Sequence, residues 1–246
     1  MTQSATQWPW ERLERGNVGS QTTLIALLDP QPGERFLDVG TGSGGLALLG
    51  ARTGATVTGL DVAADGVARA SERARAEGLD VTFEVGDAQS LSHPDGSFDV
   101  VASAYGVNFA LDHRRAALEL ARVTAPGGRL GLLLMPSESR TAGVFTLLRA
   151  FGGEHGDHPA AFADRVDELL GEWFELDVRL RETTEETSSG AEHSWEDALE
   201  GFAPLRHVVA KLTEDRVAEL RAQLEAHFAR WEGRPATYVL ALGRRR

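Results

Sequence analysis

The chain contains no cysteine among its 246 residues. This absence excludes disulfide bonds, thiolate metal sites and cysteine nucleophiles. An excess of positive charge is missing as well, because 25 Lys and Arg residues face 37 Asp and Glu, a formal net charge of −12. Since a nucleic-acid-binding surface normally needs many Lys and Arg residues, we expect no nucleic-acid partner.

Long apolar runs are also missing. No stretch approaches the roughly 18 apolar residues of a membrane helix, and residues 1–15 lack the apolar core of a secretion signal. We therefore expect a soluble, cytoplasmic protein without a membrane partner. Its length and its 42% hydrophobic content fit one large α/β domain over residues 1–246.

Short apolar runs alternate with helical segments between residues 33 and 136. The expected strands are Arg35–Val39, Thr56–Asp61, Val81–Val85, Phe98–Ala104 and Arg129–Met135. The expected helices between them are Leu46–Arg52, Asp65–Gly78 with Asp65 as N-cap, and one capped by Asp112. This alternation predicts a doubly wound parallel sheet with helices on both faces. Ligands of such sheets bind beyond the carboxyl ends of the strands.

The second half of the chain is less regular. Residues 137–172 and 194–232 are mostly helical in pattern, and we expect them to form a helical cover near the acceptor. Between them, residues 172–184 carry apolar side chains at period two, which predicts a half-exposed strand. Tyr238–Leu242 is expected to be the final strand.

A glycine-rich segment, residues 38–45, lies directly between the first strand and the first helix of this alternation. Its glycines let the backbone turn tightly and approach a ligand, while the helix start offers unpaired N–H groups. The spacing of Gly40, Gly42 and Gly45 also satisfies the dinucleotide fingerprint. A nicotinamide-dependent oxidoreductase, or a tight turn without a ligand, is compatible with this segment alone.

Three acidic residues at strand ends narrow the choice of ligand for this glycine-rich segment. Asp38 precedes the glycines, where a carboxylate suits a cationic amine rather than a pyrophosphate. Asp61 closes the second strand, where an acid accepts hydrogen bonds from ribose hydroxyls. Asp87 follows the third strand, where a carboxylate accepts from an exocyclic amine of a base. An amino acid, a ribose and an adenine in this order describe S-adenosylmethionine.

The same segments resemble the motifs of class I S-adenosylmethionine-dependent methyltransferases. Residues 38–44 resemble motif I, residues 59–61 the ribose-binding motif, residues 86–88 the adenine-binding motif, residues 98–101 the fourth strand, and residues 120–128 the segment before strand five. The resemblance is closest to the group that includes quinone-biosynthesis and other small-molecule methyltransferases. It implies a Rossmann-like, seven-stranded, mostly parallel sheet with an antiparallel last strand.

The motifs and the resemblance together define an expected cofactor site for S-adenosylmethionine and its product S-adenosylhomocysteine. The resemblance implies that Val62 packs on the adenine face, and that Ala104 and Tyr105 lie near the sulfonium and the acceptor. The complete set is Asp38, Gly40, Thr41, Gly42, Gly44, Asp61, Val62, Asp87, Ala88, Ala104 and Tyr105.

Catalytic residues are harder to identify, because methyl transfer from a sulfonium is an in-line displacement that needs mainly positioning. The candidates near the acceptor are Tyr105, Asn108, His155 and His158. Tyr105 is equally compatible with an inert pocket wall, and the two histidines with an exposed loop. We expect no metal site. The remaining histidines are expected at the surface: His93, His113, His193, His207 and His227.

The favoured function is methyl transfer to a small organic acceptor rather than to RNA, since the surface is acidic. The alternatives left open are the nicotinamide-dependent oxidoreductase and a non-catalytic or repurposed S-adenosylmethionine-binding protein. The atom that is methylated and the oligomeric state are left open as well.

Overall fold

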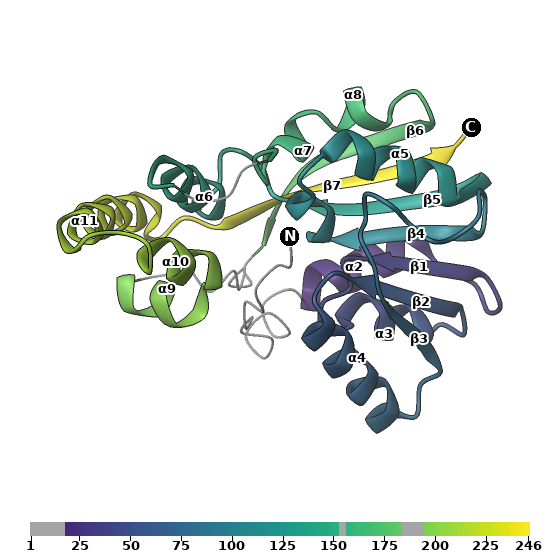
Figure 1. The fold of residues 1–246 in the computed structure, drawn as a ribbon. Coiled ribbons are helices and arrows are strands. Elements are labelled where there is room, and N and C mark those ends of the chain that lie inside the picture. Colours follow the sequence, from purple (N-terminus) through teal and green to yellow (C-terminus); the bar gives the residue numbers. More distant parts are fainter. Residues whose placement is uncertain (1–17, 153–155, 184–193) are drawn as a thin grey trace.

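The computed structural model describes residues 18–152, 156–183 and 194–246. Its described strands form one seven-stranded sheet in the order β3-β2-β1-β4-β5-β7-β6 (Figure 1). The strands are β1 Arg35–Val39, β2 Thr56–Asp61, β3 Val81–Val85, β4 Phe98–Ala104, β5 Thr124–Leu134, β6 Phe174–Thr183 and β7 Ala236–Arg245. The helices that accompany the parallel strands are α2 Val18–Leu28, α3 Gly45–Ala51, α4 Ala64–Glu77, the 3₁₀ turn η1 Gly106–Phe109 and α5 His113–Val123.

Strands β3, β2, β1, β4 and β5 run parallel, as the alternating pattern predicts. Asp38 of β1 lies opposite Gly59 of β2 on one side and Ala102 of β4 on the other. The strand order reverses between β1 and β4, which makes this the switch point of the sheet. The carboxyl ends of β1, β2 and β4 therefore meet where a ligand site is expected.

Strand β1 is buried on both faces, which explains its nearly continuous apolar sequence. Phe36 packs with the cluster under α2 and α3, whereas Leu37 packs with the cluster under α5. Neighbouring residues of a strand point to opposite faces, so β1 joins both clusters. Each such fully buried side chain contributes roughly 1.5–3 kcal/mol to folding.

The last strand confirms the expectation of an antiparallel end to the sheet. The predicted segment Tyr238–Leu242 lies within β7, which pairs antiparallel with β5 and β6. Strand β6 pairs with β7 from Phe174 to Thr183, so the expected strand is present. It is not half-exposed throughout: residues 177–182 are exposed on both faces, because the apolar cluster of the sheet reaches only Phe174 and Leu176. Strand β5 starts at Thr124, earlier than predicted, with a register shift opposite Phe98.

Helix ends follow the expected signals with one exception. Asp112 caps α5 by accepting from the backbone N–H of Arg115 at 3.0 Å, and Gly78 ends α4 at φ +67°. The prediction that Asp65 is the N-cap of α4 is wrong, because Ala63 holds that position. Asp65 lies in the first turn, where its charge still favours the positive end of the helix dipole.

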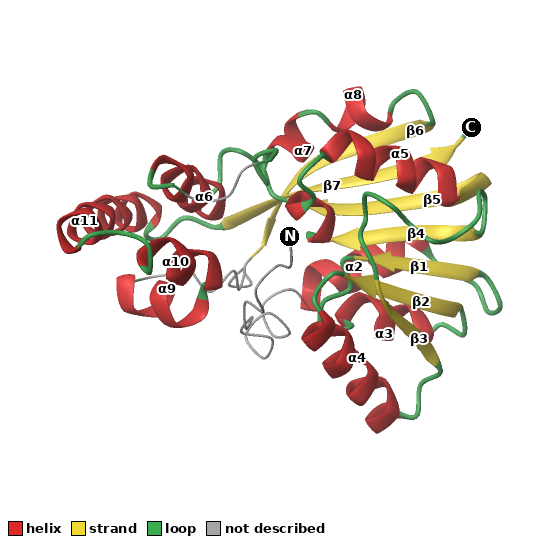
Figure 2. Ribbon diagram, in the orientation of Figure 1, coloured by secondary structure: helices red, strands yellow, loops and turns green. Residues whose placement is uncertain are grey.

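The expected helical cover divides into two parts. The short helices α7 Ala161–Asp164 and α8 Val166–Leu170 pack on the sheet with α5. The other helices form a lobe with its own apolar cluster, which lies beside the carboxyl ends of the parallel strands (Figures 1 and 2). The lobe comprises α6 Arg140–Ala150, α9 Trp195–Gly201, α10 Ala203–Val209 and α11 Glu214–Trp231. None of the described helices is long and apolar enough to cross a membrane.

Candidate functional site

The glycine loop after β1 turns through left-handed backbone conformations at Gly40, Gly42 and Gly44, with φ of +71°, +54° and +85°. The N–H groups of Gly40 and Thr41 both donate to the carbonyl of Leu60, at 2.8 and 2.9 Å. These bonds hold the loop against the end of β2. A side chain at Gly40 would collide with η1, since its Cβ would lie 2.5 Å from the Cα of Gly106.

Asp38 is a buried carboxylate beneath this loop. Its Oδ2 accepts from the hydroxyl of Thr41 at 2.7 Å and from the N–H of Ala47 at 3.0 Å. Its Oδ1 is buried and accepts no hydrogen bond from the described residues. Burial raises the pKa of Asp38 to about 7, against the lowering effect of these two donors. A cationic donor at Oδ1 would relieve the cost of ionising this group.

Asp61 closes β2 and faces the same loop. Its Oδ2 accepts from the N–H of Gly42 at 2.8 Å, and its Oδ1 accepts from the N–H of Ala63 at 2.9 Å. Burial raises the pKa of this carboxyl as well. Each carboxylate oxygen has a second lone pair, so a pair of hydroxyl groups can still donate to Asp61. The next residue, Val62, presents an apolar side chain that is 50% exposed.

Asp87 is exposed at the end of β3 and is held by a residue that the sequence reasoning missed. The backbone and side-chain N–H groups of Gln89 donate to Asp87 Oδ1, at 2.9 and 3.0 Å. The carbonyl of the same side chain accepts from the N–H of Asp112 at 2.8 Å. Gln89 therefore fixes Asp87 relative to the start of α5. Ala88 packs against the core below.

The end of β4 carries an unusual backbone conformation. Tyr105 has a φ of +66°, a left-handed value that non-glycine residues seldom adopt, and its N–H donates to the carbonyl of Leu133 at 2.9 Å. Such conformations concentrate at functional sites. The preceding residue, Ala104, packs against the core cluster under α2 and α3. The turn at Tyr105 starts η1, which folds back over the glycine loop.

Two further residues that the sequence reasoning missed hold η1 in place. Gly106 allows the close approach to Gly40. The hydroxyl of Ser103 donates to the carbonyl of Val39 at 2.6 Å and accepts from the N–H of Val107 at 3.1 Å. Their only sequence signal is position, because both flank Ala104 and Tyr105 at the end of a predicted strand.

Asn108, an acceptor-side candidate, is fully buried on η1. Neither its side-chain oxygen nor its side-chain nitrogen has a partner among the described residues. Its backbone carbonyl, in contrast, accepts from Nε2 of His113 at 3.0 Å. A buried amide without partners is uncommon in proteins and points to a ligand or water at this position.

His158 connects the sheet to the lobe and is not an exposed loop residue. Its Nδ1 accepts from the N–H of Ala160 at 3.2 Å, so the proton resides on Nε2, which lies 3.1 Å from the hydroxyl of Thr146 on α6. Burial lowers the pKa of His158. The other loop candidate, His155, lies outside the described residues. In the part of the chain that the structure describes, no group of three His, Cys, Asp or Glu residues could hold a metal ion.

The expectation of a surface position is wrong for His113 and His227. His113 is fully buried because it begins the apolar stripe of α5 that continues through Ala116, Ala117 and Leu120. Burial lowers its pKa. His227 packs on Gly143, and its Nε2 donates to the carbonyl of Arg140 at 2.8 Å. His207 is exposed as expected, His93 is partly buried, and His193 lies outside the described residues.

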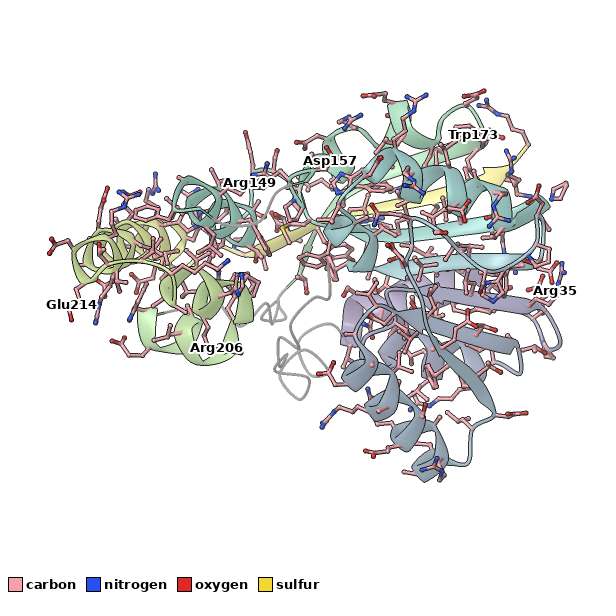
Figure 3. The ribbon with its side chains drawn as sticks, in the orientation of Figure 1. Arg35, Arg149, Asp157, Trp173, Arg206 and Glu214 are labelled. Carbon is pink, nitrogen blue, oxygen red and sulfur yellow. The ribbon has the colours of Figure 1, made fainter. Side chains whose placement is uncertain are left out.

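A surface cavity of about 570 Å³ opens at the opposite end of the sheet. It is lined by Gly96 before β4, Pro126 near the start of β5 and Trp173 before β6, among others. Figure 3 shows Trp173 at the end of the sheet that is far from the lobe. This cavity is therefore separate from the carboxyl ends that carry the three acids.

Comparisons with known proteins agree with this geometry. Residues 37–132 match a family model described as a methyltransferase domain. A 27-O-demethylrifamycin SV methyltransferase from Amycolatopsis mediterranei is 32% identical over 221 residues, which cover 85% of this chain and 79% of that protein. A demethylmenaquinone methyltransferase from Thermus thermophilus is 44% identical over 111 residues, covering 44% of this chain and 50% of that protein.

The fold itself matches solved structures over most of its length. The YcgJ protein from Bacillus subtilis superimposes with a TM-score of 0.64 at 20% identity, covering 93% of this chain and 98% of that one. The sequence relatives favour methyl transfer over the nicotinamide-dependent alternative. The chain belongs to the class I S-adenosylmethionine-dependent methyltransferases.

Proposed function

We propose that this S-adenosylmethionine-dependent methyltransferase acts on a small, largely apolar organic molecule that carries adjacent hydroxyl and carbonyl groups. The observation that carries the proposal is the buried, unpartnered amide of Asn108. Relatives named for a demethylrifamycin and a demethylmenaquinone support a small-molecule acceptor. A net charge of −12 favours such an acceptor over RNA.

We assign the cofactor to the carboxyl ends of β1, β2 and β3. The buried Oδ1 of Asp38 suits the cationic amine, and the free lone pairs of Asp61 suit the ribose hydroxyls. The exposed side chain of Val62 offers an apolar surface to the adenine. Asp87 and Ala88 follow β3, whose last residue, Val85, pairs with Asp61 at the end of β2. Gly40, Thr41, Gly42 and Gly44 bring backbone close to the ligand, and Ala104 and Tyr105 would lie beside the sulfonium.

An aromatic chain supports an apolar acceptor. Phe109 of η1 is 43% exposed, and its ring centroid lies 5.6 Å from that of Phe145 on α6. Phe145 in turn lies 5.2 Å from Phe202, which precedes α10. These three rings run from the end of β4 into the lobe. A flat apolar molecule can pack on the exposed ring of Phe109 with little loss of conformational entropy.

The amide of Asn108 adds a requirement for polar groups on an acceptor that packs against these aromatic rings. It precedes Phe109 on η1 and offers one acceptor and two donor positions. Leaving such a group unpaired in the interior costs about 1–3 kcal/mol. A hydroxyl that donates to Oδ1, next to a carbonyl that accepts from Nδ2, would satisfy both ends. Asn108 is therefore proposed to bind and orient the acceptor.

Bound S-adenosylmethionine supplies an electrophilic methyl group on a sulfonium that is a good leaving group. Transfer to the acceptor oxygen would be an in-line displacement, in which the electron pair of the carbon–sulfur bond would stay on sulfur and the hydroxyl proton would pass to solvent. The protein contributes orientation, since Asn108 fixes the oxygen and η1 closes over the glycine loop. His158 is a poor base, because its accepting Nδ1 is already bonded to Ala160.

We further propose that residues 1–246 act as one domain in the cytoplasm. The core, residues 33–136, would bind the cofactor, and residues 137–172 and 194–232 would shape the acceptor region. The contacts from Phe109 to Phe145 and from His158 to Thr146 support this joint role, because each links the sheet side to α6.

The test is formation of S-adenosylhomocysteine from methyl-labelled S-adenosylmethionine with a panel of acceptors. The panel contains flat hydroxyketones, matched ketones without the hydroxyl, aliphatic amines and RNA. Label transfer to the hydroxyketones, but not to the matched ketones, is the expected outcome. Transfer to RNA or amines alone, or no transfer to any member, would contradict the proposed acceptor class.

A further inference from the structure

Strand β6 is a long edge strand. It spans ten residues, Phe174–Thr183, and pairs with β7 on one side along its whole length. No strand among the described residues pairs with its other side, and Figure 2 shows it at the margin of the sheet. Proteins usually keep such edges short or covered, because unpaired backbone N–H and C=O groups can pair with another chain.

The two faces of β6 differ in character. One face carries acids followed by bases, namely Glu175, Asp177, Arg179 and Arg181, all of them exposed. The other face carries Leu176, Val178 and Leu180, and the exposed fraction rises to 38% at Val178 and 66% at Leu180. An apolar row thus continues past the part of β6 that α8 covers.

The order of charges makes this strand complementary to itself. A two-fold axis that pairs two copies of β6 antiparallel must place one residue opposite its own equivalent. With Val178 at that centre, Asp177 faces Arg179 of the second copy and Glu175 faces Arg181. Leu176 then faces Leu180 on the apolar side. All four facing charge pairs, two on each side of the axis, are opposite in sign.

Neighbouring registers lack this property. A centre at Leu176 places Glu175 opposite Asp177 of the second copy, and a centre at Leu180 places Arg179 opposite Arg181, so like charges face each other in both registers. A centre at Asp177 or Arg179 places that charged residue opposite its own copy. Like charges directly opposite in a sheet are destabilising, whereas opposite charges and apolar pairs stabilise it. The sequence of β6 therefore selects one register.

We propose that two copies of this chain associate edge to edge through β6, in the register centred on Val178, and so continue the sheet across a homodimer. Asp177 and Arg179, whose Oδ1 and Nε lie 2.9 Å apart within one chain, exchange this contact for the same contact between copies. The exchange costs little, since exposed ion pairs are worth little. The cofactor site stays accessible, because β6 lies three strands from β4 in the sheet order.

Charge reversal on the full-length chain tests the interface by sedimentation velocity over a wide concentration range. Asp177→Arg and Arg179→Glu each turn the central pairs repulsive and are expected to weaken dimerisation by about tenfold or more. Arg230→Glu, an exposed charge change on α11 in the lobe, serves as the control and should leave dimerisation unchanged.

Two complementary experiments make the test specific for the register centred on Val178. The double variant Asp177→Arg with Arg179→Glu restores opposite charges and should dimerise like the natural chain. The two single variants, mixed, should form a heterodimer, because their facing residues again differ in sign. Unchanged thermal melting and S-adenosylmethionine binding show that each variant is folded. A monomeric natural chain, single variants that still dimerise, or a double variant that stays monomeric would each overturn the proposal.

Discussion

Gly40 and Gly106 meet backbone to backbone at the switch point of the sheet. A Cβ on Gly40 would lie 2.5 Å from the Cα of Gly106, and a Cβ on Gly106 would lie 2.6 Å from the Cα of Gly40. The first glycine belongs to the loop after β1 and the second to the turn after β4. Their contact fixes the glycine loop and η1 relative to each other, so the proposed cofactor and acceptor sites share one backbone contact.

Substituting Gly40 with Ala should damage both folding and cofactor binding. The added methyl meets backbone rather than a flexible side chain, and Gly40 has a left-handed φ of +71°. We expect a loss of about 3 kcal/mol or more in the free energy of unfolding, combining backbone strain with overpacking. Thermal and chemical denaturation measure this loss, and titration of S-adenosylmethionine measures binding.

Gly127→Ala is the matched control. Gly127 has a φ of +72°, but a Cβ there meets nothing within 4 Å. Gly127→Ala should lose only about 1–2 kcal/mol of stability, the cost of a left-handed conformation for alanine, and should retain its affinity for the cofactor. Equal effects of the two substitutions would show that the contact between Gly40 and Gly106 contributes nothing to stability or to cofactor binding.

The buried carboxyl of Asp38 makes the stability of the free protein depend on pH. Its pKa is raised by burial from 3.8 to about 7, so the folded state retains a proton that the unfolded state has lost. The contribution of Asp38 to stability is therefore full at low pH and is lost as pH rises toward 7. Asp38→Asn should unfold with a flatter dependence on pH over this interval, as measured by thermal melting.

Cofactor binding should show the opposite dependence, because the cationic amine is proposed to bind ionised Asp38. Affinity for S-adenosylmethionine should rise by about tenfold per pH unit up to pH 7 and then level off. Asp38→Asn should bind more weakly and without this rise. Calorimetric titrations of both proteins at several pH values make the comparison; a natural chain with flat affinity below pH 7 would contradict the role of Asp38.

Much of the parallel half of the fold could be predicted from the sequence. β1, β2, β3 and β4 have the predicted bounds, because each is a short run bounded by turn residues. The acids at the strand ends could be found for a related reason, since parallel strands bring their carboxyl ends to one edge. The true N-cap of α4 could not be found in the sequence, because Ala63 has no side-chain acceptor and makes no side-chain capping hydrogen bond.

Long-range packing explains most of the remaining differences between the structure expected from the sequence and the observed structure. The lobe depends on contacts such as His227 against Gly143, which join residues far apart in the sequence. The burial of Asn108 is of the same kind, because η1 is covered partly by α7. His113 is different: its stripe with Ala116, Ala117 and Leu120 was visible in the sequence and could have identified it as buried.

Replacing Asn108 with Leu should separate stability from activity. Leu has the same branched shape and the same number of side-chain heavy atoms, and it removes two buried polar groups that lack partners. The melting temperature of the free protein should therefore stay equal or rise. If Asn108 orients the acceptor, kcat/KM should fall by about tenfold to a hundredfold, while the affinity for S-adenosylmethionine stays the same.

Steady-state kinetics with the hydroxyketone identified by the acceptor panel make this measurement. A marked loss of stability in Asn108→Leu would mean that the amide has partners in the folded protein. Unchanged kcat/KM would remove Asn108 from the acceptor site. The two outcomes are independent, because one concerns the free protein and the other the reaction.

Asp61→Ala should weaken S-adenosylmethionine binding by about 1–3 kcal/mol through the loss of charge-assisted hydrogen bonds. Part of this effect comes through the glycine loop, because Asp61 also accepts from Gly42. Asp61→Asn keeps one acceptor oxygen and should lose less. Asp80→Ala, an exposed position before β3, is the control and should bind normally in the same calorimetric titration.

The most direct test of the cofactor assignment is a crystal structure of the protein with S-adenosylhomocysteine. The account predicts the ribose hydroxyls within hydrogen-bonding distance of Asp61, the amine beside Asp38 under the glycine loop, and the sulfur facing η1. A nucleoside bound elsewhere, or with its ribose turned away from Asp61, would contradict it.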